Sequence, residues 1–169
     1  MKDQLKRSME ELGRLSVNEF KSADKLPVIV ILDNVRSMHN VGSVFRTSDA
    51  FRVQKIMLCG ITATPPHREI TKTALGATES LEWEYFEKTI DCVEKLKNEG
   101  FSIYAIEQVK ESRMLDKTVF KDSGKTAFIF GNEVFGVDEI VLGRTDGAIE
   151  IPQFGTKHSF NISISVGIV

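Results

Sequence analysis

The chain has 169 residues, of which 41% are hydrophobic and 27% are charged, and its formal net charge is −2 at pH 7. This length fits one compact domain that buries about two-thirds of its unfolded surface. No apolar run approaches the roughly 20 residues of a membrane span, and the first residues lack the apolar core of a signal peptide. We therefore expect a globular, cytoplasmic protein.

The N-terminal residues carry a helical pattern. Leu5, Met9, Leu12 and Leu15 recur at helical spacing, which predicts a short amphipathic helix. We expect residues 1–25 to form a short helical extension and residues 26–169 to form the main domain.

Beyond this extension, strand-like and helix-like segments alternate. Short apolar runs typical of buried strands occur at Val28–Leu32, Lys55–Cys59, Trp83–Phe86, Phe101–Ile106, Thr126–Phe130 and Gly147–Ile151. Helical patterns fall at Asn40–Phe51, Pro65–Leu75 and Thr89–Asn98, the last of which stops before Gly100. This alternation predicts an α/β domain built on a mainly parallel sheet, with helices on both faces. Ligands of such sheets bind beyond the carboxyl ends of the strands.

Two segments are less regular. Residues 111–124 predict a surface loop. Residues 161–168 alternate polar and apolar side chains, and that period by itself predicts a strand.

Charge is unevenly distributed along the chain. Residues 34–58 carry four basic residues against one acidic residue, whereas residues 79–99 carry seven acidic residues against three basic ones. Either one face of the molecule is basic or the charges are scattered over its surface, and the sequence leaves both open.

Cysteine and histidine spacing predicts neither a disulfide framework nor a metal site. Cys59 and Cys92 lie far apart without a CxxC pattern, and His39, His67 and His158 do not have ligand spacing. We expect two reduced core thiols and no metal.

The first motif is HNVGSVFRTSDAF, residues 39–51. Asn40 predicts an N-cap, and Gly42 beside a helix N-terminus is typical of an anion seat, although a plain cap fits equally. Arg46 lies opposite the apolar face of this helix and is flanked by small residues. A guanidinium there is suited to phosphate, although an ordinary exposed arginine also fits the pattern.

Three further segments follow predicted strands. FGNEVFG places Gly131 and Gly136 around Asn132 and Glu133, which fits either a ligand loop or a simple turn. IPQFGTKHSFNIS contains Ser159 and Asn161, which are candidate helix caps or polar ligands. Glu107 lies at the end of the predicted strand Phe101–Ile106, where it is either a site residue or an ordinary polar loop residue. The glycine-rich signatures of dinucleotide sites and P-loops are absent from the sequence.

Together these segments resemble the three motifs of the SpoU/TrmH family of RNA ribose methyltransferases, within the SPOUT class. The family pattern N-x-G-S-x-x-R-T/S-x-x-A-F is matched by NVGSVFRTSDAF, F-G-x-E-x-x-G by FGNEVFG, and I-P-M-x-G-x-x-x-S-L-N-V-S by IPQFGTKHSFNIS. Order and spacing agree from about Leu26 to Gly167. Gln153 and Phe160 replace the usual methionine and leucine, and a chain ending at Val169 contains only the start of the family's C-terminal helix.

The resemblance implies an α/β fold with a C-terminal deep trefoil knot that binds S-adenosylmethionine, in a homodimer with its active site near the subunit interface. It also predicts that residues 159–169 form a loop leading into a helix rather than a strand. The family's functional positions fall on Asn40, Arg46, Glu133, Ser159 and Asn161. The implied cofactor-binding residues are Ile106, Glu107, Gly131, Asn132, Gly136, Ile151, Pro152 and Phe160.

The implied activity is methyl transfer to a ribose 2′-hydroxyl of RNA. Only about 25 residues precede the first predicted strand, which favours a minimal enzyme that recognises a compact tRNA element. Methylation of rRNA and a non-catalytic RNA-binding protein of the same fold are the alternatives.

Overall fold

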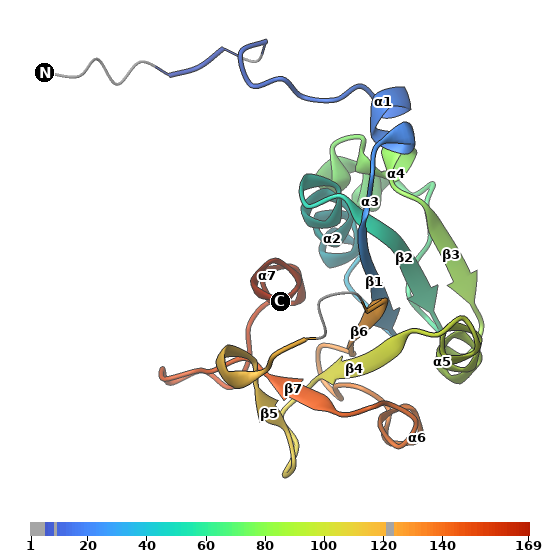
Figure 1. Ribbon diagram of the computed structural model, residues 1–169, viewed down its shortest axis with the longest axis vertical. Coiled ribbons are helices and arrows are strands. Elements are labelled where there is room, and N and C mark those ends of the chain that lie inside the picture. Colours follow the sequence, from blue (N-terminus) through green and yellow to red (C-terminus); the bar gives the residue numbers. More distant parts are fainter. Residues whose placement is uncertain (1–5, 9, 121–123) are drawn as a thin grey trace, which may run out of the picture.

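The computed structural model describes residues 6–8, 10–120 and 124–169, and its centre is one parallel β-sheet (Figure 1). Its strands lie in the order β3-β2-β1-β6-β4-β7-β5, and every neighbouring pair is parallel. The strands are β1 (Leu26–Asp33), β2 (Val53–Cys59), β3 (Trp83–Phe86), β4 (Ser102–Ile106), β5 (Arg113–Met114), β6 (Thr126–Phe130) and β7 (Ala148–Glu150). The α/β class and the parallel sheet predicted from the sequence are confirmed.

Helices cover both faces of the sheet. One face packs against α1 (Val17–Ser22), α2 (Met38–Ala50), α3 (Arg68–Ala74), α4 (Ala77–Ser80) and α7 (Ile162–Ile168). The other packs against α5 (Thr89–Asn98) and α6 (Glu139–Leu142). Because both faces are covered, the central strands are continuous apolar runs, and neighbouring residues of β1 such as Ile31 and Leu32 belong to opposite cores.

The N-terminal helix begins later than the sequence pattern indicates. Of the residues in that pattern, Leu5 and Met9 lie outside the described residues, and residues 10–13 form a turn. The helix is α1, where Ser16 and Glu19 form a capping box. Local capping, rather than the spacing of leucines, therefore decides where this helix starts.

Two other predictions differ from the structure. The expected loop at residues 111–124 contains β5, which extends the sheet beside β7, and a 3₁₀ turn at Leu115–Lys117. The short helices α4 and α6 have no clear sequence pattern. Residues 162–168 form a helix, as the family resemblance implies and against their alternating period, because Asn161 caps them and Ile162 packs into the core.

Both cysteines are buried free thiols in the core between the sheet and α5. A hydrogen bond with the Cys92 thiol, together with burial, raises the pKa of Cys59 and keeps it a neutral thiol. The prediction of two core thiols is confirmed. Among the described residues, no helix is long and apolar enough to cross a membrane.

Candidate functional site

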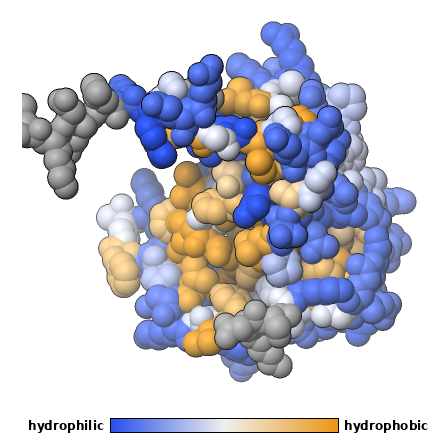
Figure 2. All heavy atoms as spheres, turned by 45° about the horizontal axis from the view of Figure 1, so that its top comes forward, coloured by the Kyte–Doolittle hydropathy of each residue, from blue (hydrophilic) through white to orange (hydrophobic). Residues whose placement is uncertain are grey.

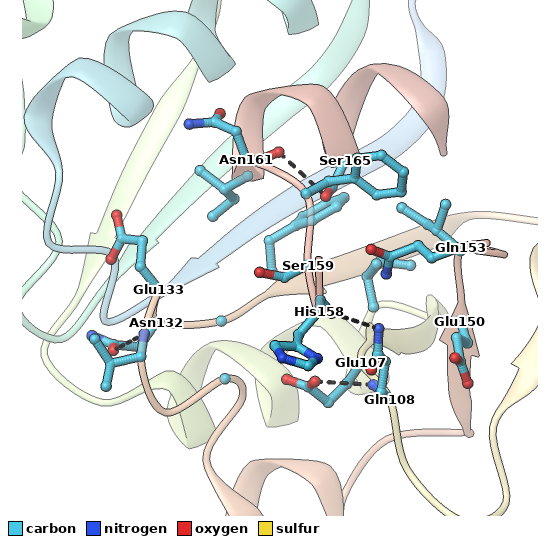
Figure 3. A pocket seen from close by; sticks show the side chains of 18 of the residues that line it. Glu107, Gln108, Asn132, Glu133, Glu150, Gln153, His158, Ser159, Asn161 and Ser165 are labelled. Atoms are coloured by element: carbon cyan, nitrogen blue, oxygen red, sulfur yellow. Dashed lines mark hydrogen bonds between the residues drawn. The ribbon is translucent and has the colours of Figure 1, made fainter. Parts of the chain in front are cut away.

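A cavity of about 480 Å³ lies at the carboxyl ends of β4, β6 and β7 (Figure 3). The starts of α2 and α7 close its remaining side. Because these three strands are neighbours in the sheet, their following loops meet at one edge. The cavity lies beyond the carboxyl strand ends, where the sequence predicts a ligand site.

A chain of hydrogen bonds joins the three sequence motifs at the rim of this cavity. The Asn161 side chain donates to Asn40 Oδ1 over 2.9 Å, and Asn40 Nδ2 donates to Glu133 Oε1 over 3.0 Å. The Glu133 carboxylate also accepts the backbone N–H groups of Arg36 and Ser37, each over 3.0 Å. Residues far apart in sequence are thereby held at fixed positions around one opening.

Asn40 does not cap α2, contrary to the sequence prediction. Ser37 is the N-cap, and its side chain accepts the backbone N–H of Asn40. Asn40 therefore lies inside the first turn, where its amide is free to bridge Glu133 and Asn161.

The environment of Glu133 favours its ionised form. Partial burial acts to raise the pKa of the carboxyl group, but the backbone donors and the Asn40 amide outweigh burial and lower it. Glu133 is thus a carboxylate at neutral pH.

The FGNEVFG segment after β6 is a tight loop closed by Asn132. The backbone groups of Asn132 and Gly136 exchange two hydrogen bonds of 2.9 Å, and the Asn132 side chain accepts the N–H groups of Val134 and Phe135. A Cβ atom at Gly131 would overlap the Gly136 backbone. The absence of a side chain at Gly131 is therefore required for the closure of the loop that lines the cavity.

Glu107, at the end of β4, holds the same loop from the other side. Its carboxylate accepts the N–H of Val137 over 3.0 Å and that of Gln108 over 2.9 Å. Gly136 has φ +71°, and a Cβ atom there would overlap Glu107 Oε2. Glu107 is consequently a structural support of the cavity as well as one of its lining residues.

Asn161 begins α7 beside the cavity. Its side-chain oxygen accepts the backbone N–H of Ser163 over 2.9 Å, so one side chain caps α7 and bonds to α2. Ser159, labelled in Figure 3, and Phe160 precede it, and both line the cavity. The sequence left cap and polar ligand as alternatives for Asn161, and its two contacts combine a cap with a bond across the site.

Twelve residues were proposed from the sequence as site residues besides Arg46, and the cavity brings eleven of them together. These are Asn40, Ile106, Glu107, Gly131, Asn132, Glu133, Gly136, Ile151, Ser159, Phe160 and Asn161. Pro152 is half-buried next to Ile151 and is not a lining residue. Gln153, which replaces the family's methionine, does line the cavity.

Arg46 lies outside this cavity. It is exposed on α2 and has no hydrogen bond or ion pair within residues 6–8, 10–120 and 124–169. It follows Asn40 by about 9 Å along the helix axis, at about 1.5 Å per residue. Long helical side chains lean toward the N-terminus, which here is the cavity end of α2.

Gly42 has a packing role that the sequence did not indicate. It is buried, and a Cβ atom there would overlap Thr73 Oγ1 and the Ile70 carbonyl of α3. The space beside Gly42 is therefore occupied by α3. The absent side chain of Gly42 lets α2 and α3 approach closely.

Several lining residues were not predicted from the sequence. Gln108 and Glu150 directly adjoin predicted positions at strand ends, so extending each strand-end set by one residue identifies them. Ser165 enters the cavity one turn after Asn161, which requires residues 162–168 to be a helix. His158 also lines the cavity, and its backbone carbonyl accepts Gln108 Nε2 over 2.9 Å.

The fold and the cavity define an α/β protein whose ligand site is built from three adjacent strand-end loops and two helix N-termini. The model of the SpoU rRNA Methylase family matches residues 27–169. The chain belongs to this family.

Two of the similar proteins are named for different kinds of RNA. A tRNA (guanosine(18)-2′-O)-methyltransferase of Thermus thermophilus is 31% identical over 169 residues, which cover 96% of this chain and 82% of that protein. The 23S rRNA (guanosine-2′-O-)-methyltransferase RlmB of Neisseria meningitidis is 29% identical, covering 85% of this chain and 56% of that protein.

Solved structures share the fold. The AdoMet-bound rRNA methyltransferase of Sinorhizobium meliloti superposes with a TM-score of 0.79 at 25% identity, covering 88% of this chain and 57% of that one. The TrmH/SpoU tRNA modifying enzyme of Aquifex aeolicus gives a TM-score of 0.76 at 27% identity, covering 88% of this chain and 74% of that one.

Proposed function

We propose that this protein transfers a methyl group from S-adenosylmethionine to a ribose 2′-hydroxyl of RNA. The observation that carries the proposal is the hydrogen-bond chain Asn161–Asn40–Glu133, which joins the three motifs at the mouth of the strand-end cavity. Family membership and the named 2′-O-methyltransferase relatives support it. A non-catalytic RNA-binding protein would have no need of the complete set of motif residues.

The cavity fits S-adenosylmethionine. Its volume lies within the range of about 300–1,000 Å³ that is typical of small-molecule sites. Three carboxylates line it, from Glu107, Glu133 and Glu150, and its described lining residues include no lysine or arginine. This charge favours the sulfonium and ammonium of the cofactor, while apolar lining such as Ile106 and Ile151 suits an adenine ring.

We propose roles for the five functional positions. When bound, S-adenosylmethionine supplies a methyl group on a sulfonium, which is an activated leaving group. Asn40 and Asn161 hold the nucleotide at the rim, and Glu133 fixes Asn40 in orientation. Ser159 hydrogen-bonds near the reacting atoms. The chemistry then depends on aligning the hydroxyl with the methyl group and on removing one proton.

Arg46 has the central role in this proposal. Its exposed guanidinium is free to bind the phosphate next to the reacting ribose and to position the 2′-hydroxyl. A free guanidinium is a very poor base, so the proton passes through the neighbouring phosphate rather than to Arg46 alone.

The RNA substrate we favour is tRNA. The Thermus thermophilus relative, which acts on tRNA, is matched over 82% of its length, whereas the rRNA-modifying relative is matched over 56% of its own. Methylation of rRNA is the second candidate. Methyl incorporation into bulk tRNA and bulk rRNA, each prepared from cells lacking the gene, separates the two.

The decisive variant is Arg46→Ala. We expect it to abolish methyl incorporation while leaving the Kd for S-adenosylmethionine within about twofold, because Arg46 lies outside the cavity. Near-normal turnover would refute the assigned role. Wild-type protein that binds the cofactor but methylates neither RNA pool would favour the non-catalytic alternative.

We also propose the deep trefoil knot and the cytoplasmic homodimer that the family resemblance implies. The knot is supported by the loops after β4, β6 and β7, which converge with α7 on one cavity.

The dimer is supported by a groove of about 290 Å³ between α2, α7, β1 and β6, lined mainly by apolar residues. Exposed Phe51 and Ile168 border this groove, and hydrophobic residues gather in the middle of the face seen in Figure 2. Light scattering after size exclusion tests the dimer, and a monomeric mass contradicts it.

A further inference from the structure

The segment between β7 and α7 presents a large aromatic side chain to solvent. Phe154 is 98% exposed, the most exposed of the large hydrophobic side chains in the described residues. Figure 1 shows that this segment projects from the body of the molecule. The ring packs into neither core, so its faces are available to stack on another molecule.

Both ends of this segment are held at the cavity. Gln153 lines the cavity before Phe154, and His158 lines it after (Figure 3). The Gln108 side chain, at the end of β4, donates to the His158 carbonyl over 2.9 Å. Phe154 therefore stands beside the mouth of the proposed methyl-transfer site and not elsewhere on the surface.

The charges around the mouth separate two kinds of ligand. The cavity carries the carboxylates of Glu107, Glu133 and Glu150, which repel a phosphate. Lys157 is exposed in the projecting segment three residues after Phe154, and its ammonium has no ion-pair partner in the described part of the chain. A polyanion is thus excluded from the cavity and attracted to the segment outside it.

An exposed aromatic ring and a free cation in one segment are the combination that binds unpaired nucleotides. Bases that are not stacked in a helix stack on aromatic side chains, while basic groups contact the backbone. A base inside a continuous duplex does not offer its face. The pairing of Phe154 with Lys157 therefore selects for an RNA whose bases are exposed.

We propose that Phe154 stacks on an unpaired base of the RNA substrate next to the methylated ribose, while Lys157 contacts an adjacent phosphate. This inference rests on the proposed function, and it narrows the substrate class to nucleotides in loops or single strands. The alternative occupant of Phe154, a second copy of this chain, is an outcome of the test.

The test compares the full-length variants Phe154→Trp, Phe154→Leu and Phe154→Ala in methylation of bulk tRNA. We expect Leu and Ala to raise the KM for RNA at least about fivefold, since stacking on one base contributes about 1–3 kcal/mol and about 1.4 kcal/mol equals tenfold. Trp retains a KM within about twofold of wild type. The Kd for S-adenosylmethionine and the oligomeric mass stay unchanged in all three variants.

A matched control and a direct probe accompany these measurements. Ile140→Ala truncates a 73% exposed apolar side chain on α6, which covers the face of the sheet opposite α7, and should leave the KM for RNA unchanged. In the Phe154→Trp variant, single-stranded oligoribonucleotides should quench the added tryptophan fluorescence, and duplex RNA should not.

Two results would overturn the proposal. The first is a wild-type KM for RNA in Phe154→Leu, which shows that no ring is needed. The second is a fall in oligomeric mass in Phe154→Leu or Phe154→Ala, which assigns the ring to a subunit interface. Failure of the proposed function would give a different result from failure of this inference. The wild-type protein would then show no methyl transfer, whereas the quenching experiment would still report stacking.

Discussion

Replacing Glu133 by glutamine tests the hydrogen-bond chain that joins the three motifs. The side chain keeps its shape, but one carboxylate oxygen becomes an NH₂ group. If the remaining oxygen keeps the bonds to Ser37 and Asn40, then the NH₂ group faces the backbone N–H of Arg36, which loses its acceptor. We expect a less stable protein in which Asn40 is no longer held firmly between Glu133 and Asn161.

The magnitude follows from the number of bonds lost. A hydrogen bond to a charged group contributes about 1.5–3 kcal/mol, and the exposure of Glu133 reduces this contribution to about 1 kcal/mol. For a domain of this size, that lowers Tm by about 2–4 °C. Methyl transfer should fall more steeply than stability, because a small displacement of Asn40 misaligns the reacting groups.

The pH dependence gives the sign of the electrostatic contribution. The pKa of Glu133 is lowered in the folded state. Its stabilisation is therefore complete above the unfolded pKa of about 4.3 and is lost as the pH falls through the lower folded pKa. The difference in unfolding free energy between wild type and Glu133→Gln should be constant from about pH 6 to 8 and should shrink as the pH falls below about 4.

Urea unfolding followed by circular dichroism measures this difference at each pH. Glu87→Gln is the matched control, because it removes the same charge from an exposed side chain with no hydrogen-bond partner among the described residues. A difference for Glu133→Gln that is the same at acidic and neutral pH would refute the reasoning. So would a Glu87→Gln variant that is destabilised equally.

Three other variants test separate parts of the site. Gly42→Ala should lower the free energy of unfolding by about 1–3 kcal/mol, because the added methyl group forces α2 away from α3. Gly155→Ala, which has open space around it, should leave Tm unchanged. Equal Tm values for the two variants would contradict the packing role of Gly42. Asn161→Ala removes the cap of α7 and the bond to Asn40, and should cost about 1–2 kcal/mol in chemical unfolding with a larger proportional loss of methyl transfer. Glu150→Gln should weaken calorimetric binding of S-adenosylmethionine more than that of the uncharged-sulfur product, and equal weakening would argue against a charge effect.

The positions of the strands were predictable because both faces of the sheet are buried. The buried part of a parallel strand is apolar, so residues 28–32 of β1, 56–59 of β2 and 127–130 of β6 appear in the sequence as uninterrupted apolar runs. The C-terminal segment shows the limit of this reasoning. Its period of two predicts a strand, but a single capping residue, Asn161, and burial of Ile162 make it a helix.

The site was predictable to the extent that its residues follow strands. Glu107, Gly131 and Ile151 come directly after strands, and parallel topology brings such positions to one edge. The roles of Asn40 and Gly42 were not predictable, since a cap and an internal helix residue look alike in sequence, and so do a glycine for a ligand and a glycine for a neighbouring helix.

The sequence by itself determined the class of fold, the family and the edge of the sheet that carries the cavity, because these depend on local patterns of burial and on the order of motifs. Only the tertiary structure decided which groups bond to one another. The chain Asn161–Asn40–Glu133 spans 121 residues of separation in one hydrogen bond and 93 in the next. Such contacts depend on how helices and loops are packed, and local propensity carries no record of them.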